Sequence, residues 1–452
     1  MNLKICTVET PGLGDRSYLA HDGEVAVVID PQRDIDRMLA VARDEGVRIT
    51  HVLETHLHND YVTGGLALAR EAGAEYVVSG DDDVDFDRVP ATDGMEFRTG
   101  ALTVKAIATP GHTEHHLAYE LRGDGKGATA VFTGGSMLFG AVGRTDLVST
   151  EATDGLTRAQ FQSVRRLAGE LPSETEVFPT HGFGSFCSAT ATSGDSSTVG
   201  KERDTNIALT MSDEDEFVRT LLDGLGAYPR YYAHMGPANA KGPGRPNLAA
   251  PEVVDPAELR RRIDAGEWVV DLRQRKAFAR THVQGTVSIE IGDPFATYFG
   301  WTVPWGAPVT LIGETADEVS EAQRQLSRIG IDRLAGAATG SVEGLGAGRT
   351  SSYPAATFKD LAKVIDDEGV VVLDVRRPDE WDAGHLRDVA NIPFWELAER
   401  SGEVPPGQVW VHCASGFRAA IGASILHRAG HDVVHVDDDW EHAASAGLPM
   451  AE

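Results

Sequence analysis

The sequence predicts an α/β protein made of more than one domain, and three observations indicate it. Segments with the apolar run of a buried strand are followed repeatedly by segments with the period of an amphipathic helix. A stretch rich in glycine, proline and asparagine, residues 236–246, interrupts this alternation as a linker would. Beyond it, one pattern of residues occurs twice. A chain of 452 residues accommodates about two to four domains of ordinary size.

The part of the chain before the linker alternates between strand and helix patterns. Residues 25–30 form an apolar run typical of a buried strand, and residues 34–46 have a helical period that ends at glycine. Further strands are predicted at 49–54, 75–79, 102–108, 118–121, 130–133 and 176–179, and further helices at 62–73 and 157–171. We expect this part to form one α/β domain over residues 1–245.

The part beyond the linker repeats itself. Asp271-Leu272-Arg273 follows an apolar run, as Asp374-Val375-Arg376 does, and His282 matches His385. Each copy is about 100 residues long, the size of a small α/β domain. We therefore expect two domains of one fold, residues 250–345 and 352–452.

Composition narrows the class of protein. The net charge is −28, with 69 acidic against 41 basic residues, so nucleic acid is not an expected partner. The acidity is typical of proteins from salt-loving organisms, or alternatively reflects simple solubility. No apolar run approaches the roughly 20 residues that span a bilayer, and the first residues lack the pattern of a secretory signal. Three cysteines do not make a disulfide framework. We expect a cytoplasmic protein without a membrane partner.

Four loops that follow predicted strands carry residues able to bind a metal. The first supplies His56, His58 and Asp60, the second His112, and the fourth His181. The third loop, Thr133-Gly134-Gly135, has no such side chain. Imidazole and carboxylate groups brought together from separate loops are typical of catalytic metal sites.

These four loops resemble the metal motifs of the metallo-β-lactamase superfamily, an αββα sandwich. Two members of the family's ligand set differ in this chain. Tyr61 stands where the family has histidine, and Gly135 stands where it has a bridging aspartate. Since a two-metal hydrolase needs both, we do not expect hydrolysis of β-lactams, thioesters or phosphodiesters by a two-metal mechanism.

The chain is more similar to the persulfide dioxygenase branch of that superfamily. The resemblance covers residues 1–245 through the loops above, Gly140-Ala141-Val142-Gly143-Arg144-Thr145-Asp146-Leu147, and the segment from Thr180 to Cys187. It implies one Fe(II) held by two histidines and one aspartate. It assigns the histidines to His56 and His112, and the aspartate position falls on Gly135.

Three outcomes are open for such an incomplete triad. Water, chloride or a nearby carboxylate can complete the iron site; His58 or Asp60 can move in to give a site for iron or zinc; or the domain binds no metal. We assign His181 and Cys187 to substrate binding, with Cys187 either holding a persulfide in transit or serving as a small buried thiol.

The last domain carries a cysteine loop, Cys413-Ala414-Ser415-Gly416-Phe417-Arg418, between a predicted strand and a helix. Backbone N–H groups, the helix N-terminus and Arg418 would stabilise a thiolate or an anionic persulfide on Cys413. Gly416 permits the tight curve. The catalytic residues expected are Cys413 and Arg418, and Ser415 and Gly416 are expected to bind substrate.

This loop resembles the active loop of rhodaneses, Cys-x-x-Gly-x-Arg, as do Glu380-Trp381, Gly384-His385-Leu386 and Asn391-Ile392-Pro393. One departure is Asp437-Asp438-Asp439 before Trp440, where the family prefers glycines. In the first copy, Gly313 stands at the cysteine position, so we expect an inactive rhodanese-like domain at 250–345 and an active one at 352–452.

The two resemblances together imply an enzyme that oxidises a thiol persulfide to sulfite and transfers sulfur through Cys413. Its partners would be a small-molecule persulfide, thiosulfate or sulfite, in a homo-oligomer. One alternative is a sulfurtransferase whose metal domain is degenerate and acts as a binding module, because of Tyr61 and Gly135. Another alternative is a mononuclear thioester hydrolase.

Overall fold

The structure is a computed structural model, and it describes residues 3–123, 129–189, 192 and 194–451. The chain divides into two compact units. The first is Met1–Pro246 together with Ser327–Gly330, and the second is Asn247–Leu326 together with Ile331–Glu452. Within the described ranges, no helix combines the length and the apolarity needed to cross a membrane.

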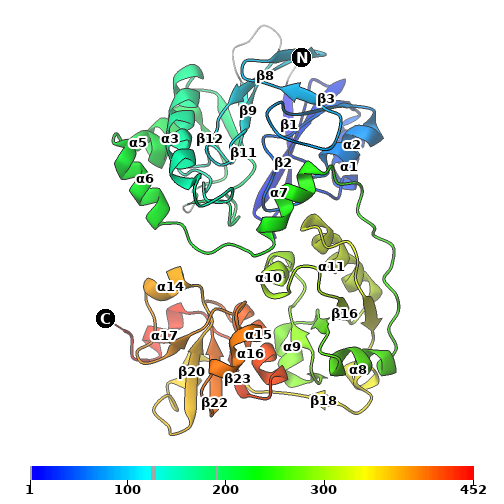
Figure 1. Cartoon of the computed structure of the whole chain (residues 1–452), viewed down its shortest axis with the longest axis vertical. Helices are drawn as coiled ribbons and strands as arrows, with labels where there is room; N and C mark the ends of the chain where they lie inside the picture. The colour runs from blue at the N-terminus through cyan, green and yellow to red at the C-terminus, as the bar shows by residue number, and fades with distance from the viewer. Residues whose placement is uncertain (1–2, 124–128, 190–191, 193, 452) are drawn as a thin grey trace. The chain divides into compact units, whose positions relative to one another are not determined.

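The first unit is a sandwich of two six-stranded sheets (Figure 1). One sheet has the order β1 (Lys4–Thr10), β2 (Asp15–His21), β3 (Val25–Ile29), β4 (Arg48–Leu53), β5 (Glu75–Ser79) and β6 (Val89–Ala91). The other has the order β12 (Ser197–Thr198), β11 (Glu176–Pro179), β10 (Ala130–Gly134), β9 (Leu117–Arg122), β8 (Leu102–Ala108) and β7 (Glu96–Thr99). Both sheets are mixed: β3 to β6 are parallel neighbours, as are β10 and β11.

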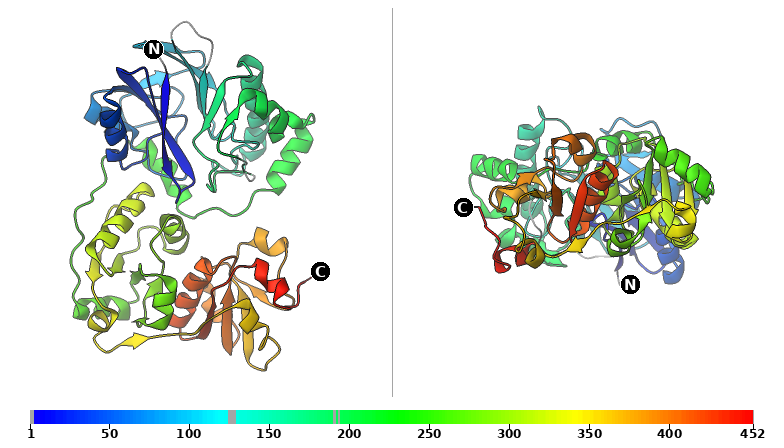
Figure 2. Two further views of the ribbon diagram at one scale, coloured as in Figure 1. Left: turned by 180° about the vertical axis from the view of Figure 1, so that it is seen from behind. Right: turned by 90° about the horizontal axis from the view of Figure 1, so that it is seen from below.

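Helices cover the outer faces of the sandwich (Figures 1 and 2). The first sheet carries α1 (Asp36–Glu45) and α2 (Gly65–Ala72), and the second carries α3 (Thr153–Glu170), α4 (Val199–Thr205), α5 (Ile207–Thr210) and α6 (Glu214–Asp223). An apolar core that includes Tyr18, Val27, Tyr119 and Phe132 fills the space between the sheets. Burial of this apolar area is the main force that holds the two sheets together.

Several helix boundaries differ from the sequence prediction: the helix expected at 157–171 begins at Thr153, and the one expected at 34–46 begins at Asp36. The helix expected at 62–73 begins at Gly65, because Thr63 forms a β-bridge with Gln32 and its hydroxyl accepts from Gly65 N–H. The expected linker 236–246 is partly helical, since α7 spans Tyr232–Ala240. Its buried Asn239 donates to the backbone oxygens of His58 and Tyr61 and accepts from Thr63 N–H, which ties α7 to the first metal-motif loop.

The second unit contains two sheets made of parallel neighbours. The first has the order β15 (Val287–Ser288), β13 (Trp268–Asp271), β16 (Val309–Gly313) and β17 (Gly336–Thr339). The second has the order β21 (Ala390–Asn391), β20 (Val370–Asp374), β22 (Gln408–His412), β23 (Asp432–Val436) and β19 (Ala355–Ala356). We call the two halves of this unit, around residues 250–345 and 352–452, the first and second modules. In the first module β13 lies between β15 and β16, and in the second β20 lies between β21 and β22, the strand that leads into the cysteine loop.

The remaining elements of this unit surround the two sheets. The first module has α8 (Pro256–Asp264), α9 (Arg275–Arg280), β14 (His282–Val283), α10 (Phe295–Thr302), α11 (Ala316–Arg328) and α12 (Val342–Gly346). The second has α13 (Phe358–Leu361), α14 (Pro378–Asp382), α15 (Leu397–Arg400), the 3-10 turn η1 (Ser401–Glu403), α16 (Phe417–Arg428) and α17 (Glu441–Ser445). Strand β18 (Thr350–Ser351) lies between the two modules in the sequence and pairs with β14 in a small antiparallel sheet.

Candidate metal centre and sulfur-transfer loop

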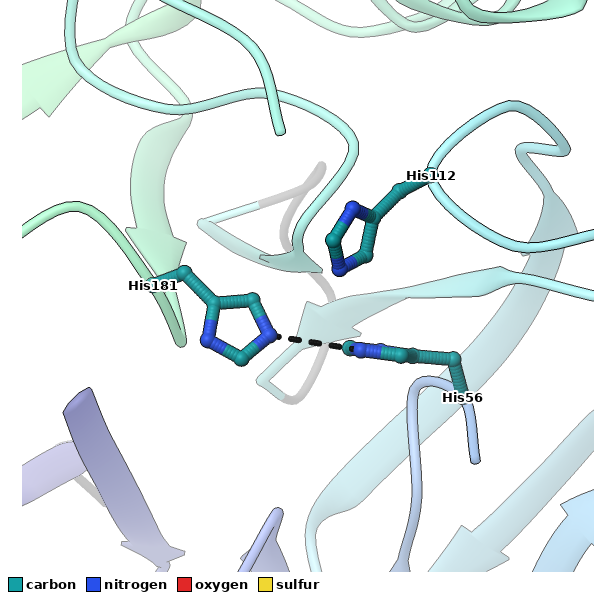
Figure 3. A group of neighbouring side chains, drawn as sticks. All are labelled: His56, His112 and His181. Carbon is teal, nitrogen blue, oxygen red and sulfur yellow. Dashed lines mark hydrogen bonds between the residues drawn. The ribbon is translucent and has the colours of Figure 1, made fainter. Parts of the chain in front are cut away.

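Three imidazole rings from three loops meet at one end of the sandwich (Figure 3). His56 follows β4, His112 follows β8, and His181 follows β11. One ring nitrogen from each of the three lies within 4.8 Å of the others, and the Nε2 atoms of His56 and His181 are 3.3 Å apart. All three side chains are buried. We call these residues the three-histidine group.

Hydrogen bonds on the far side of each ring fix its orientation. His112 Nδ1 donates to the Arg144 carbonyl at 2.7 Å, and His181 Nδ1 donates to Asp15 at 2.9 Å. His56 Nδ1 lies 2.8 Å from the hydroxyl of Thr55, which itself donates to Asp30. Each Nδ1 is therefore occupied, and each Nε2 is left to face the group, as in metal sites whose histidines are held from behind.

The site has an orphaned buried atom that fits a cation. Among the described residues, His112 Nε2 has no hydrogen-bond partner. An unpartnered buried nitrogen costs free energy, and a metal ion would satisfy it. The donor set of three imidazoles suits iron or zinc, so the residues fit a mononuclear divalent metal.

The three rings differ in their protonation. Burial, together with the neighbouring histidines, lowers the pKa of His56 well below its usual range and that of His112 to about 3. Burial also opposes the charge of His181, but Asp60 and Asp15 outweigh it and raise the pKa of His181 to about 10. The carboxylates therefore favour the protonated form of His181, whereas burial favours the neutral forms of His56 and His112.

Asp15 and Asp30 support the group, and no local pattern in the sequence points to either. Asp15 follows Gly14, whose left-handed backbone packs directly on Ser185 in the loop after His181. Asp30 ends β3 with a φ of 48° and accepts from Thr55 N–H and from the Thr180 hydroxyl. Such a conformation is rare for a non-glycine residue, and the hydrogen bonds hold it in place.

Gly135 does not leave an open position for a carboxylate. A Cβ at this residue would lie 2.6 Å from His112 Cγ, so the imidazole fills the space of the missing side chain. The Gly135 N–H donates instead to His116 Nε2. The third nitrogen of the group comes from His181, which the sequence analysis assigned to substrate binding.

His58, Asp60 and Tyr61 lie beside the group. The Tyr61 hydroxyl is 2.9 Å from His58 Nε2, and the two rings stack with centroids 4.3 Å apart. Burial disfavours the charge of His58, but Asp30 and Glu54 outweigh it and raise its pKa to about 9. His58 and Asp60 also form a possible ligand set with His181, which overlaps the three-histidine group. The Nε2 atom of His58 is therefore engaged in a buried hydrogen bond with Tyr61.

Cys187 lies next to this network and is fully buried. Burial raises the pKa of its thiol well above the usual range, and Asp60 and Asp15 add to the effect. Its backbone N–H donates to Ser185, whose hydroxyl donates to Asp60 at 3.3 Å. The thiol is therefore held in its protonated form beside the carboxylates.

A pocket of about 510 Å³ adjoins the loops that carry His58 and His112. Its lining includes Asp82, Glu114 and Asp146, and Arg144 neutralises Asp146 through two hydrogen bonds of 2.7 and 2.8 Å. Burial raises the pKa of Asp82 to about 6. No lysine or arginine is among the described residues that line this pocket.

In the second unit, Cys413 lies between the end of β22 and the start of α16 and is buried. Gly416 has a φ of 84°, and Ala419 N–H donates to Cys413 Sγ at 3.3 Å. The N-terminus of α16 therefore presents the Ala419 N–H to the sulfur. Ser415 is exposed at the tip of the loop.

The guanidinium of Arg418 is bound by another residue, Glu380. The two form an ion pair that includes one hydrogen bond of 2.8 Å. Burial disfavours the charge of Arg418, but Glu380 and Cys413 outweigh this and raise its pKa. Tyr298, from α10 of the first module, packs on Phe417 with ring centroids 5.1 Å apart, close enough for the charges of Arg418 and Cys413 to influence its hydroxyl.

The aspartates at the family's glycine-rich turn have partners. Asp437 lies against Gly416 and pairs with Arg275 at 2.7 Å and Lys276 at 3.1 Å, both from the first module. Asp438 accepts from Phe358 N–H, which fixes the far side of the turn. The turn is therefore held by ion pairs between the modules, a role that the local sequence did not reveal.

The fold and the four-loop site define the chain as a metallo-β-lactamase-fold protein. Its second unit adds a cysteine loop between a strand and a helix, residues 413–418. Residues 357–446 match the family described as rhodanese-like domain. The human protein named persulfide dioxygenase ETHE1, mitochondrial, is 30% identical over 211 residues, covering 46% of this chain and 74% of that protein. A hydroxyacylglutathione hydrolase of Cereibacter sphaeroides is 32% identical over 190 residues, covering 40% of this chain and 67% of that protein.

A solved structure described as a metallo-β-lactamase from Staphylococcus aureus subsp. aureus COL matches with a TM-score of 0.67 and 28% identity. The match covers 75% of this chain and all of that one. The chain belongs to the metallo-β-lactamase-fold family that includes ETHE1, and it joins an ETHE1-like domain to a rhodanese-like domain. The predicted α/β class and the predicted family are confirmed.

Proposed function

We propose that the chain oxidises a thiol persulfide to sulfite at a mononuclear metal site formed by His56, His112 and His181. The observation that carries this proposal is the convergence of three Nε2 atoms whose rings are each held from behind. The metal proposed is Fe(II), which when bound supplies neighbouring open positions for a thiolate and for oxygen.

The surrounding residues prepare the site. Asp15 and Asp60 hold His181 through Nδ1 and stabilise positive charge at this end of the group. Because protons compete with a cation for the imidazole nitrogens, metal affinity should rise with pH. Buried Cys187 keeps its proton beside Asp60, which makes it a structural thiol in this state rather than a persulfide carrier.

The acidic pocket suggests which persulfides are favoured. Asp82 and Glu114 repel anionic carriers and attract cationic ones over the range of a Debye length. We therefore expect cysteamine persulfide to be a better substrate than glutathione persulfide at low salt. High salt should reduce the difference between their kcat/KM values.

We further propose that Cys413 transfers sulfane sulfur. Its thiolate attacks the outer sulfur of thiosulfate, the S–S bond of thiosulfate breaks, and sulfite leaves with the bonding electron pair. The Ala419 N–H and the Glu380-held Arg418 stabilise the resulting persulfide anion on Cys413.

We infer that residues 250–345 are an inactive rhodanese-like domain. Its four strands follow the same order as four of the five strands of the active domain's sheet, and Gly313 ends β16 where Cys413 follows β22. This domain supplies Tyr298 beside the active loop and Arg275 to the turn behind it. Its proposed role is to support the active domain.

Oxygen uptake tests the oxidative function. Iron-reconstituted full chain should consume oxygen when given a persulfide, and His181→Gln should lower kcat/KM by about 100-fold or more. His51→Gln is the matched control, because His51 lies on β4 and pairs with Glu75, and it belongs neither to the pocket lining nor to the three-histidine group. No uptake at any iron loading would overturn the proposal.

A second candidate is a sulfurtransferase whose metallo-β-lactamase-fold domain only binds a ligand. Gly135 and Tyr61 favour it, since both replace ligands of the family. This function predicts thiosulfate sulfurtransferase activity through Cys413 with no persulfide-dependent oxygen uptake. Cleavage of an acyl-thiol by zinc-loaded protein would instead support the thioester hydrolase alternative.

A further inference from the structure

A thiol, an imidazole and a carboxylate meet under α1, on the outer face of the first sheet. Cys6 lies on β1, His21 on β2, and Glu45 is the last residue of α1. One ligand atom from each of the three lies within 4.8 Å of the others. They share no residue with the three-histidine group.

The fold brings these residues together for simple reasons. Lys4 pairs with His21 across the antiparallel strands, and Cys6 is two residues from Lys4, so all three side chains point to one face. Helix α1 packs on that face and ends at Gly46, which has a φ of 70°. Its end therefore places Glu45 over the two strands.

His21 indicates that a ligand is expected there. The residue is only 5% exposed, and neither of its ring nitrogens makes a hydrogen bond to the parts of the chain that the structure describes. Its Nε2 faces Glu45 Oε2 at 3.5 Å, beyond ordinary hydrogen-bond range. A buried imidazole whose nitrogens make no hydrogen bond is unfavourable, and coordination of a cation would satisfy it.

Lys4 supplies positive charge at the same place. Its ammonium lies 2.6 Å from both Glu45 oxygens and is largely exposed. A cation held by Cys6, His21 and Glu45 would displace it at little cost, because an exposed ion pair contributes little stability.

We propose that Cys6, His21 and Glu45 form a second metal site that binds Zn²⁺. Sulfur, imidazole nitrogen and carboxylate oxygen are the three ligand types of protein zinc, and water would complete the tetrahedron. The thiolate ligand disfavours Mg²⁺ and Ca²⁺, which take oxygen ligands. On binding, the Cys6 thiol loses its proton to solvent and Lys4 leaves Glu45. The site joins the first hairpin to α1.

Cobalt titration tests this site. Full chain stripped of metal with a chelator is titrated with Co²⁺, whose bond to a thiolate gives a near-ultraviolet charge-transfer band that imidazole and carboxylate ligands do not give. The band should appear in the parent protein and disappear when Zn²⁺ is added. It should be lost in Cys6→Ser and retained in Cys187→Ser and Cys413→Ser, which remove the other two thiols.

Two further variants keep the test decisive if Cys6→Ser folds poorly. His21→Gln should weaken Co²⁺ binding by about tenfold or more, and Lys4→Gln should strengthen it by removing the competing ammonium. Absence of the band, its persistence in Cys6→Ser, or unchanged affinity in both other variants would each overturn the proposal. These results are independent of persulfide oxidation, which uses other residues.

Discussion

Gly135 occupies the position of a family aspartate, and the His112 ring fills the space beside it. The loss of the carboxylate and the position of the imidazole are therefore linked. A side chain restored at this position would have to push His112 away from His56 and His181. Restoring the family's aspartate at this position is therefore expected to disrupt the three-histidine group.

Gly135→Ala should lower iron affinity by about tenfold or more, because its Cβ displaces His112. Gly135→Asp should do the same despite adding a carboxylate. Gly155→Ala, on the open surface of α3, is the control. Tighter iron binding by Gly135→Asp would show that the loop can accept the family's arrangement.

His412 stacks on Trp440 with ring centroids 5.5 Å apart, and burial lowers its pKa from 6.5 to about 4. Between these pH values the unfolded chain binds a proton that the folded chain does not. The free energy of unfolding should therefore fall as the pH drops from 6.5 to 4, by up to about 3 kcal/mol from this residue. Above pH 6.5 this contribution is constant.

Urea unfolding at pH 7 and pH 4.5 measures this effect. His412→Phe keeps the stacking and breaks no hydrogen bond within the described residues, and the contact it removes is the 3.8 Å approach of Nε2 to Asp374. The variant should lose less stability on acidification than the parent protein. Equal losses in both proteins would rule out His412 as the titrating group.

At the scale of elements, the turn between β23 and α17 depends on the neighbouring module. Asp437 is held by Arg275 and lies against Gly416 of the active loop. This pairing gives the non-glycine turn a defined place behind the active loop. The first module therefore contributes to the geometry of Cys413 without a nucleophile of its own.

Asp437→Asn and Arg275→Gln should each lower thiosulfate sulfurtransferase kcat, and the double variant should lose less than the sum of the two effects. A double-mutant cycle on unfolding should give a coupling of about 1–2 kcal/mol, since Asp437 is nearly buried. Arg261→Gln, which removes an exposed pair with Glu258, is the matched control. Additive losses of unfolding free energy in the cycle would contradict a stabilising interaction between Asp437 and Arg275.

Much of this arrangement could be predicted from the sequence. Cys413 directly follows a strand, and His56 and His112 come within four residues of the end of one, so all three are easily placed at the end of a sheet. Asp15 and Asp437 could not be predicted, because their partners come from segments far along the chain. The helical segment within the expected linker was missed for a similar reason: Asn239 is held by the loop of His58 and Tyr61.

At the scale of the whole molecule, the net charge of −28 acts on every domain. Self-repulsion between carboxylates destabilises a compact chain, and salt screens it. The midpoint of thermal unfolding should therefore rise between about 0.1 M and about 2 M KCl. Replacing KCl by an equal osmolality of sucrose separates screening from general exclusion effects, and a midpoint that falls with KCl would contradict this account.

The metal centre is the feature on which the proposed oxidation depends. Anomalous diffraction at the iron edge, from crystals of the iron-loaded full chain, locates the ion directly. We predict one peak about 2 Å from the Nε2 atoms of His56, His112 and His181. A peak held by other residues, or none at these three rings, would contradict the account.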